Sequence, residues 1–509
     1  MSAPIPAARA LTAWPLLLAL ASGALLPLAF APFNLWPLAI LCPAVLMSLW
    51  TGATPRRAAL LGFSFGAGTF SAGTWWLYIS IRGFGGAPIV LAVALIVVLV
   101  AVMATYHGLL GWLVARFLPA RGSWRWYAGL PALWLLIEWW RGWFLSGFPW
   151  FSLGYSQTDT VLAAYAPVLG VYGVSALVLL QSGALAARGD ERGRARGVAT
   201  AGLGGGGAVG WALQGVKWTH AAGAPVSVAV LQGAIPQDEK WQLDNRGPTR
   251  DLYRQLNDQA LGARLIVWPE AAIPELANEM ADYLAQIQVR SRARGSDVVM
   301  GAVRLGEDGV NYYNSIMALT DGVAFYDKRH LVIFAEYFPV PEFVRRWLRL
   351  MNLPYSDFAP GSSSQRPLVA AGLPLAPSIC YEDAYGSAQF GLVRRSSLMV
   401  NVTNDAWFGH SPARYQHLQI SRMRALEAGR YLLRAGNDGV SAIIGPRGEL
   451  VAVAPEYRPA VLRGTVEPRD GLSPYTRAGN WAVVTLMAGA AAAAGYRRRR
   501  SQSPGAPGA

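Results

Sequence analysis

The stretch LPLAPSICYED (residues 373–383) ends an uncharged, apolar run with a cysteine that is followed at once by Tyr381, Glu382 and Asp383. The apolar part predicts a buried strand, so Cys380 stands where that strand ends. Strand ends are where α/β sheets present side chains to ligands. Cys380 is therefore a candidate functional residue, although a buried and inert core cysteine would give the same local pattern.

Similar apolar runs recur throughout residues 218–475, where acidic residues and prolines are also frequent. Amphipathic segments with helical periodicity separate several of these runs. The predicted strands cover residues 226–233, 263–270, 297–304, 312–320, 373–383, 397–405 and 440–450, and the predicted helices cover 249–261, 280–293 and 417–433. Strands that alternate with helices indicate a layered α/β domain.

The rest of the chain has the composition of a membrane protein. Of the 509 residues, 53% are hydrophobic and only 15% are charged, which is unusual for a soluble enzyme. Segments without Asp, Glu, Lys or Arg cover residues 10–55, 58–81, 83–115, 160–187 and 197–216. Each is long enough to cross a bilayer, which takes about 20 apolar residues.

These segments predict about eight membrane crossings. The first run holds two, because FAPFN (residues 30–34) predicts a turn in its middle. A weaker span at 126–143 and a last one at 478–496 complete the count. We therefore divide the chain into four parts, namely a membrane domain with seven spans (1–217), an α/β domain (218–475), a final transmembrane helix (476–497) and a basic cytoplasmic tail (498–509).

The arginine distribution predicts the orientation in the membrane. With the N-terminus inside, the loop arginines fall mostly in cytoplasmic segments, and only Arg82 and Arg141 fall in short outer loops, as the positive-inside rule requires. The same distribution explains the net charge of +14 without a nucleic-acid partner. The α/β domain between the last two spans then lies outside the cytoplasm.

Cysteine and histidine usage limits the possible chemistry. The only cysteines are Cys42, within a predicted span, and Cys380, so the α/β domain holds no internal disulfide and exposes one thiol on the oxidising side of the membrane. The five histidines form neither a Cys-His protease signature nor a zinc-binding motif. We expect neither a metal nor a cofactor.

Two further charged residues follow apolar runs. Glu270 ends LIVWPE (265–270), where a carboxylate in the first turn of a helix would be equally reasonable. Lys328 lies in FYDKRHLVIFAEYFP (325–339), eight residues before Glu336, and a solvated turn would also explain it. However, only three of the 44 basic residues are lysines, and a compact ammonium can approach a thiolate more closely than a guanidinium can.

Glu270, Lys328 and Cys380, in that order and each at a strand end, resemble the Glu-Lys-Cys triad of the nitrilase superfamily. Together with the predicted spans, the chain is similar to one branch, the apolipoprotein N-acyltransferase family. The resemblance includes FAPF near the start, EWWRGWFLSGFPWFSLGYSQ (138–157), QGAIPQDEKW (232–241), WPE, YDKRHLVIFAEYFP, ICYED and NVTNDAWFG (401–409). It covers both the membrane part and the α/β part.

This resemblance implies an αββα sandwich and a monomeric, multi-pass enzyme of the bacterial inner membrane with its catalytic domain in the periplasm. Such an enzyme transfers a fatty acyl chain from a phospholipid to the N-terminal amino group of a diacylglyceryl-cysteine in an apolipoprotein, through a cysteine thioester. It also implies that Glu336 is a second essential carboxylate, that Tyr381 and Glu382 support the nucleophile, and that Trp241 lies in a substrate-facing segment.

One departure from the family pattern is VIFAEYFP, where the family more often has Pro and Gly in place of Ile333 and Ala335. The change leaves the chemistry intact and bears on the flexibility of this loop. The apolar segment 339–361 that follows predicts a loop that dips into lipid, although a packing arm between domains would look similar.

Two other functions are compatible with parts of the sequence. A membrane-tethered amidase of the nitrilase type would use the same triad, and the ordered motifs in the membrane part argue against it. A transporter or a structural membrane protein would explain the helices but not the α/β domain with its Glu, Lys and Cys.

Overall fold

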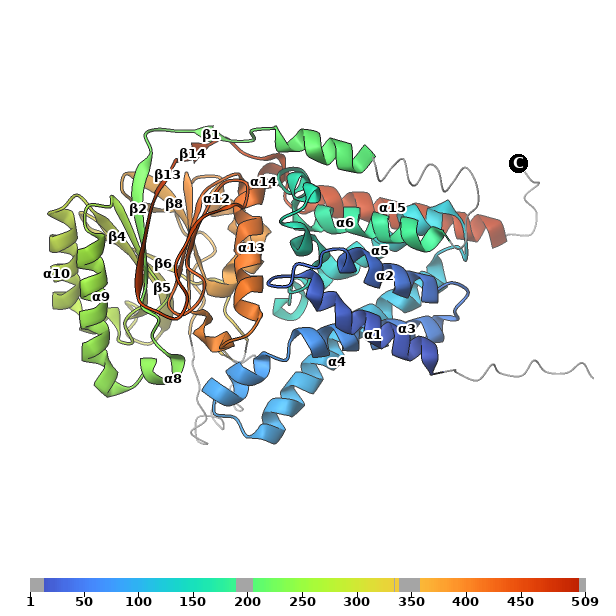
Figure 1. The fold of residues 1–509 in the computed structure, drawn as a ribbon, viewed down its shortest axis with the longest axis horizontal. Coiled ribbons are helices and arrows are strands. Elements are labelled where there is room, and N and C mark those ends of the chain that lie inside the picture. The colour runs from blue at the N-terminus through green and yellow to red at the C-terminus, as the bar shows by residue number, and fades with distance from the viewer. Residues whose placement is uncertain (1–12, 189–204, 334, 338–357, 503–509) are drawn as a thin grey trace, which may run out of the picture.

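The computed structural model describes residues 13–188, 205–333, 335–337 and 358–502. Figure 1 shows two parts side by side: a bundle of helices that contains both the start and the end of the described chain, and a sandwich of β-sheets with helices on both faces. Most of the segment predicted to dip into lipid lies outside the described residues.

The sandwich is built from two sheets of six strands each. The first sheet contains, in spatial order, β13 (Ala460–Val466), β2 (Val226–Gln232), β3 (Leu265–Trp268), β4 (Asp297–Leu305), β5 (Tyr312–Leu319) and β6 (Val323–Asp327). The second contains β12 (Leu450–Val453), β11 (Ala442–Ile444), β10 (Leu432–Gly436), β9 (Leu398–Thr403), β8 (Leu373–Ile379) and β7 (Leu368–Ala370). Strands β2, β3 and β4 are parallel, as are β8, β9 and β10.

Alternating side chains of the central strands fill separate cores. Val228 and Val230 of β2 pack toward the second sheet, whereas Ala229 and Leu231 pack beneath α9 (Arg246–Ala260) and α10 (Ala281–Arg292). Because neighbouring residues of a strand point to opposite faces, a strand buried on both faces reads as one apolar run, as VSVAVLQ does. The predicted αββα sandwich is confirmed.

The outer face of the second sheet is covered by α12 (Gly386–Val393) and α13 (Ala413–Ala428). Helix α13 is buried on nearly every side, since Leu418 and Ala425 belong to the sandwich core while Ile420 and Met423 belong to the core of the helical bundle. It lies between the two parts in Figure 1. The sandwich and the bundle are therefore joined through one shared helix.

Two hydrogen bonds tie α13 to backbone groups of the bundle. The carboxylate of Glu427 accepts a hydrogen bond from the Val171 N–H at 2.7 Å, just after Gly170 breaks the helical geometry of its segment with φ +68°. The Gln419 side chain accepts one from the Ala31 N–H at 3.2 Å, within the turn predicted at FAPFN. Such bonds satisfy donors that a broken helix or a turn leaves free.

The bundle contains, in chain order, α1 (Trp14–Leu25), α2 (Leu38–Leu49), α3 (Pro55–Gly73), α4 (Ile89–Phe117), α5 (Leu130–Arg141), α6 (Ala166–Ala187) and α15 (Trp481–Gln502). Within the described residues, two helices are long and apolar enough to cross a membrane, at Ile89–Phe117 and Val161–Ala187. Helices α1 and α2 have only 12 residues each, below the usual spanning length. The count of eight crossings stays a prediction.

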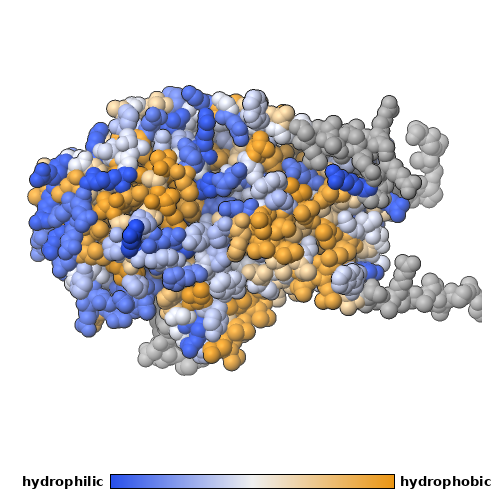
Figure 2. Space-filling model, in the orientation of Figure 1, coloured by the Kyte–Doolittle hydropathy of each residue, from blue (hydrophilic) through white to orange (hydrophobic). Residues whose placement is uncertain are grey.

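The surface of the bundle is apolar. Exposed side chains on α4 include Ile89, Val90, Val97 and Val98, and Figure 2 shows hydrophobic residues over much of this end of the molecule, with hydrophilic residues concentrated over the end that carries α9 and α10. An apolar surface of this extent indicates contact with something other than water.

The structure corrects several predicted elements. The helix predicted for 417–433 begins earlier and ends at Ala428, because Gly429 adopts a left-handed C-cap with φ +62°, and β10 follows it. The strand predicted for 440–450 is two strands, β11 and β12, separated by a turn around Gly448. Strands β6, β7, β10 and β13, together with the two-stranded sheet of β1 (His220–Ala221) and β14 (Arg469–Asp470), were not predicted.

The contact at Gly170 gives a test of how the two parts dock. A Cβ at this position would lie 2.2 Å from the ring of Tyr475, which lies in α14 (Pro474–Ala478), and the backbone has φ +68°. We expect Gly170→Ala to destabilise the protein by about 1–3 kcal/mol. Thermal unfolding in detergent measures the effect, and Gly207→Ala, where a methyl group meets no atom within 4 Å, is the control. Equal unfolding temperatures for the two variants would contradict this expectation.

Candidate active site

The three residues predicted to act together each follow directly after a strand. Glu270 follows β3 and Lys328 follows β6, which is parallel to β3 in the first sheet through two antiparallel steps. Cys380 follows β8 of the facing sheet. The carboxyl ends of such strands form the usual ligand-facing edge of an α/β sheet.

Two of these residues and Glu336 form a buried cluster of charges. The Lys328 ammonium lies 2.8 Å from a Glu336 carboxylate oxygen and 3.7 Å from Oε1 of Glu270. The Asn314 side chain, on β5, donates to Glu270 at 2.7 Å and to Glu336 at 2.9 Å. One amide and one ammonium therefore hold both carboxylates in fixed positions. Glu336 also accepts from the Val332 N–H at 2.8 Å, which closes the loop between it and Lys328.

The charge of Lys328 depends on its partners. Burial opposes the charge of this ammonium, which is 1% exposed, but the carboxylates of Glu336 and Glu270 outweigh burial and raise the pKa of Lys328 above its usual range. The lysine stays protonated through the physiological range as a result. A fixed positive charge in a buried site can stabilise an oxyanion.

Cys380 begins the short helix η9 (Cys380–Ala384) with a backbone φ of +51°. Residues other than glycine rarely adopt this conformation, and its cost is of order 1–3 kcal/mol. The side chain is half-buried. Burial, and then the Glu270 carboxylate, raise the pKa of the thiol, while Lys328 lowers it. The thiol is thus protonated at rest and needs a base to react.

Glu382 connects the segments that carry Cys380 and Lys328. One carboxylate oxygen accepts from the Ile379 N–H at 2.9 Å, and the other accepts from the N–H groups of Arg329 at 2.7 Å and His330 at 3.1 Å. The Tyr326 hydroxyl donates to the same carboxylate. Burial raises the pKa of Glu382, whereas the hydrogen bonds from these backbone N–H groups lower it. Each of these donors requires an acceptor oxygen. The role of Glu382 is to fix the distance between the two sheets at the site.

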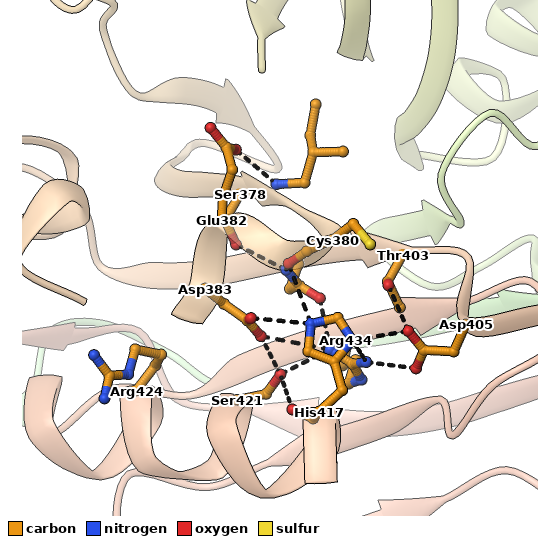
Figure 3. A network of polar contacts seen from close by, with 12 residues as sticks. Ser378, Cys380, Glu382, Asp383, Thr403, Asp405, His417, Ser421, Arg424 and Arg434 are labelled. Carbon is orange, nitrogen blue, oxygen red and sulfur yellow. Dashed lines mark hydrogen bonds and ion pairs between the residues drawn. The ribbon is translucent and has the colours of Figure 1, made fainter. Parts of the chain in front are cut away.

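A second charged network lies beneath Cys380 and was not predicted from the sequence (Figure 3). The His417 ring, on α13, contacts Asp405 at 2.8 Å through Nδ1 and Asp383 at 3.0 Å through Nε2. Arg434, on β10, donates to Asp405 at 2.7 Å. Burial and the nearby Arg434 lower the pKa of His417, but Asp383 and Asp405 outweigh them and raise it to about 9.

Within the described part of the chain, Cys380, Asp405 and His417 form the one group with a donor set that could hold a metal ion, their ligand atoms lying within 4.8 Å of one another. The group is a poor fit for a metal, because both ring nitrogens of His417 already contact carboxylates and Arg434 occupies the remaining Asp405 oxygen. A divalent ion would add charge beside two buried cations. That no metal takes part stays a prediction.

The helical bundle supplies one wall next to the cysteine. The Tyr381 ring stacks near Trp150, with centroids 6.0 Å apart, and the Tyr385 hydroxyl donates to the Ser146 carbonyl at 2.9 Å. Arg141 holds this segment by donating to the carbonyl oxygens of Phe148 and Trp150 at 2.6 and 2.7 Å. The tryptophan-rich motif at 138–157 is therefore part of the site's surroundings.

Trp241 follows directly after the short helix α8 (Gln237–Lys240) and is half exposed. The preceding residue, Lys240, is fully buried and donates to the Glu270 backbone carbonyl at 3.2 Å. Burial lowers the pKa of Lys240 to about 8, despite the nearby Glu270 carboxylate. The segment with Trp241 is thus fixed directly to the turn that carries Glu270.

Comparison with known proteins identifies the two parts of the chain. The family described as carbon-nitrogen hydrolase matches residues 227–470, so the sandwich is a domain of the carbon-nitrogen hydrolase class. The family described as apolipoprotein N-acyltransferase N-terminal domain matches residues 22–184.

Full-length relatives define the family more closely. The apolipoprotein N-acyltransferase of Methylococcus capsulatus is 41% identical over 96% of this chain and 97% of the relative, and that of Nitrosomonas europaea is 42% identical over 95% and 98%. The solved structure of XC1258 from Xanthomonas campestris, a CN-hydrolase superfamily protein, is 18% identical over 56% of this chain and 100% of that one, with a TM-score of 0.36. The chain belongs to the apolipoprotein N-acyltransferase family.

The acceptor role of Glu382 can be tested by an isosteric change. In Glu382→Gln an NH₂ group replaces one oxygen and faces a backbone N–H, so we expect about 1–3 kcal/mol of lost stability together with reduced activity. Thermal unfolding and a turnover assay measure both. Glu307→Gln, at an exposed position, is the control. A Glu382→Gln protein with wild-type unfolding temperature and turnover would show that the carboxylate does not hold the two segments.

Proposed function

We propose that this protein transfers a fatty acyl chain from a phospholipid to the N-terminal amino group of a diacylglyceryl-cysteine in an apolipoprotein. The observation that carries the proposal is the position of the Glu270, Lys328 and Cys380 group, which lies against a bundle of helices with an apolar surface. Enzymes named for this activity share about 40% of their residues with the chain over nearly its full length.

In the first half-reaction, Glu270 accepts the proton of the Cys380 thiol while the sulfur attacks the ester carbonyl of the phospholipid. The carbonyl oxygen becomes an oxyanion, and the Lys328 ammonium stabilises it. Collapse breaks the ester C–O bond, and the lysophospholipid leaves with the proton that Glu270 holds. The product is a thioester on Cys380, and Glu336 keeps Lys328 in place throughout.

In the second half-reaction, the amino group of the diacylglyceryl-cysteine attacks the thioester. Glu270 accepts a proton from the attacking nitrogen, and the Cys380 thiolate leaves when the amide forms. That proton then returns to the sulfur, which restores the thiol. One acyl chain moves in each cycle, and the two substrates react in turn, so ping-pong kinetics are expected.

The lipid nature of both substrates explains the membrane location. Each methylene moved from lipid into water costs about 0.8 kcal/mol, so a full acyl chain has to reach Cys380 without entering water. We propose that the chain enters between Trp241 on one side and the wall of Tyr381 and Trp150 on the other. The exposed aromatic residues of the 138–157 segment suit the membrane–water interface.

We further propose about eight crossings, with residues 1–217 and 476–497 in the membrane, residues 218–475 on the periplasmic side of the bacterial inner membrane and residues 498–509 in the cytoplasm. The arginine distribution supports this orientation. The short helices α1, α2 and α5 would each span with the help of the turns and single-turn helices that adjoin them. We propose that the enzyme acts as a monomer.

A chase experiment separates this function from that of a membrane-tethered amidase. Purified enzyme is incubated with phospholipid alone, and a mass spectrum is searched for a hydroxylamine-labile acyl group on Cys380. We expect the adduct to accumulate and to pass to a diacylglyceryl peptide. Glu270→Gln should form at least 100-fold less adduct in the same time, on the order expected for loss of a general base, and Cys380→Ala should form none. Rapid release of free fatty acid without transfer would favour the amidase instead.

The orientation has its own test. In a Cys42→Ser background, Cys380 is the only thiol. We expect a small membrane-impermeant thiol reagent to label Cys380 in intact spheroplasts, slowly because burial raises the pKa of this thiol. Labelling that requires permeabilised spheroplasts, in a protein that reacts in detergent, would place the domain on the cytoplasmic side.

A further inference from the structure

The network beneath the nucleophile joins four buried charges to the backbone of Cys380. His417 and Arg434 carry the positive charges, and Asp383 and Asp405 carry the negative ones. All four side chains are at most 2% exposed. They come from four different elements, namely η9, η10 (Asp405–Phe408), α13 and β10. Figure 3 shows them gathered under the turn that begins at Cys380.

The geometry favours a charged His417. Nδ1 lies 2.8 Å from an Asp405 oxygen and Nε2 lies 3.0 Å from an Asp383 oxygen, and a carboxylate can only accept a hydrogen bond. Arg434 Nη2 also lies 3.0 Å from Nδ1, but it donates to the other Asp405 oxygen at 2.7 Å. A neutral imidazole has one N–H, so one of these contacts would then bring two acceptors together. Only the imidazolium donates on both sides. Its charge and that of Arg434 balance the two carboxylates, so the network is neutral overall.

The His417 ring also contacts the backbone of Cys380. Nε2 of His417 lies 3.3 Å from the Cys380 carbonyl oxygen, which also accepts from Asn401 Nδ2 at 3.2 Å. The Asn401 side chain is itself oriented by Arg434, which donates to Asn401 Oδ1 at 2.8 Å. Both donors to this carbonyl are therefore part of, or held by, the charged network.

These contacts act on a strained residue. A backbone φ of +51° at Cys380 persists only if the surroundings hold it, and the orientation of the Cys380 carbonyl is coupled to that angle. From this arrangement we infer that His417 is a positioning residue for the nucleophile, whose imidazolium holds the Cys380 backbone so that the sulfur can reach the acyl ester. This inference rests on the proposed function, because it takes Cys380 as the nucleophile.

The inference predicts slow acylation in a folded variant. In His417→Gln the side chain can donate through one group only, so we expect adduct formation on Cys380 to slow by on the order of 100-fold, the loss typical of a misplaced reacting group. The KM for phospholipid should change by less than about threefold, because His417 does not touch the substrate. The control is His410→Gln, since His410 is exposed and its ring stacks on Tyr457 outside the network.

A pH profile distinguishes positioning by the imidazolium from a general effect on folding. The raised pKa of His417 means that its contribution is complete below about pH 6.5 and is lost as pH rises through about 9. In Asp383→Asn one carboxylate is removed, which lowers the pKa of His417. We therefore expect the alkaline fall in the acylation rate to move down by about one pH unit or more.

The other titratable and charged groups that face this site do not account for that shift. Asp383 also raises the pKa of Tyr381, but burial is the largest cause of that rise, so the Tyr381 hydroxyl stays protonated in Asp383→Asn. Arg434 and Asp405 are unchanged in Asp383→Asn. The pKa of Asp405 is lowered, because Arg434 and His417 outweigh its burial, so it stays ionised. Facing Cys380 from the first sheet, Lys328 stays protonated because its pKa is raised, and Glu270 and Glu336 are untouched. A change confined to the alkaline limb is thus assigned to His417.

The possible outcomes distinguish a failure of the proposed function from a failure of the role of His417. If the wild-type protein forms no acyl adduct, the proposed function fails. If the wild-type protein forms it and folded His417→Gln forms it at the same rate, only the role of His417 is overturned. Should His417→Gln not fold, Asp383→Asn decides: a downward shift of the alkaline limb supports the role, and an unshifted profile overturns it.

Discussion

The site depends on a buried ammonium that water does not solvate. Lys328 is 1% exposed, and an isolated charge at such a depth would cost several kcal/mol or lose its proton. The charge is balanced by the carboxylates of Glu270 and Glu336, which the amide of Asn314 holds in place. Each of these three residues comes from a different strand or loop of the first sheet. Glu382 then fixes this cluster relative to the cysteine on the second sheet. The αββα sandwich brings the turn with Lys328, on the first sheet, and the turn with Cys380, on the second, together in a buried position.

A second constraint is that the catalytic domain and the helical bundle share structure. Cys380 lies between a charged network that α13 completes and an aromatic wall that the bundle provides through Trp150. Since α13 also packs on the sandwich core, a displacement of the bundle would be transmitted to His417 and to the turn at Cys380. The helical bundle therefore helps to shape the surroundings of the Cys380 sulfur.

Much of this could be predicted from the sequence. Glu270 and Cys380 end short apolar runs, and the position of such residues at the edge of a sheet follows from strand geometry. The His417 network could not be predicted in the same way, because its members are 12 to 51 residues apart in sequence. In addition, part of β10 was assigned to a predicted helix that extended too far. The available signal was Arg434 within the apolar run LLRAG, since a charge in a buried strand requires a counter-charge. The membrane crossings are harder still to predict. Helices of 12 residues have the apolar composition of a membrane span but not its length.

The burial of α13 on nearly every side also affects how the chain can vary. One face of this helix fits a sheet, another, which carries Glu427, fits the helices of the bundle, and His417 lies between these two faces. A mutation on an ordinary amphipathic helix has a solvent side where it does little harm, but here almost no such side exists. Random mutagenesis would thus find fewer tolerated substitutions across residues 413–428 than across α9, which is similar in length and has a polar outer face. A helix of this kind ties the evolution of the catalytic domain to that of its membrane partner.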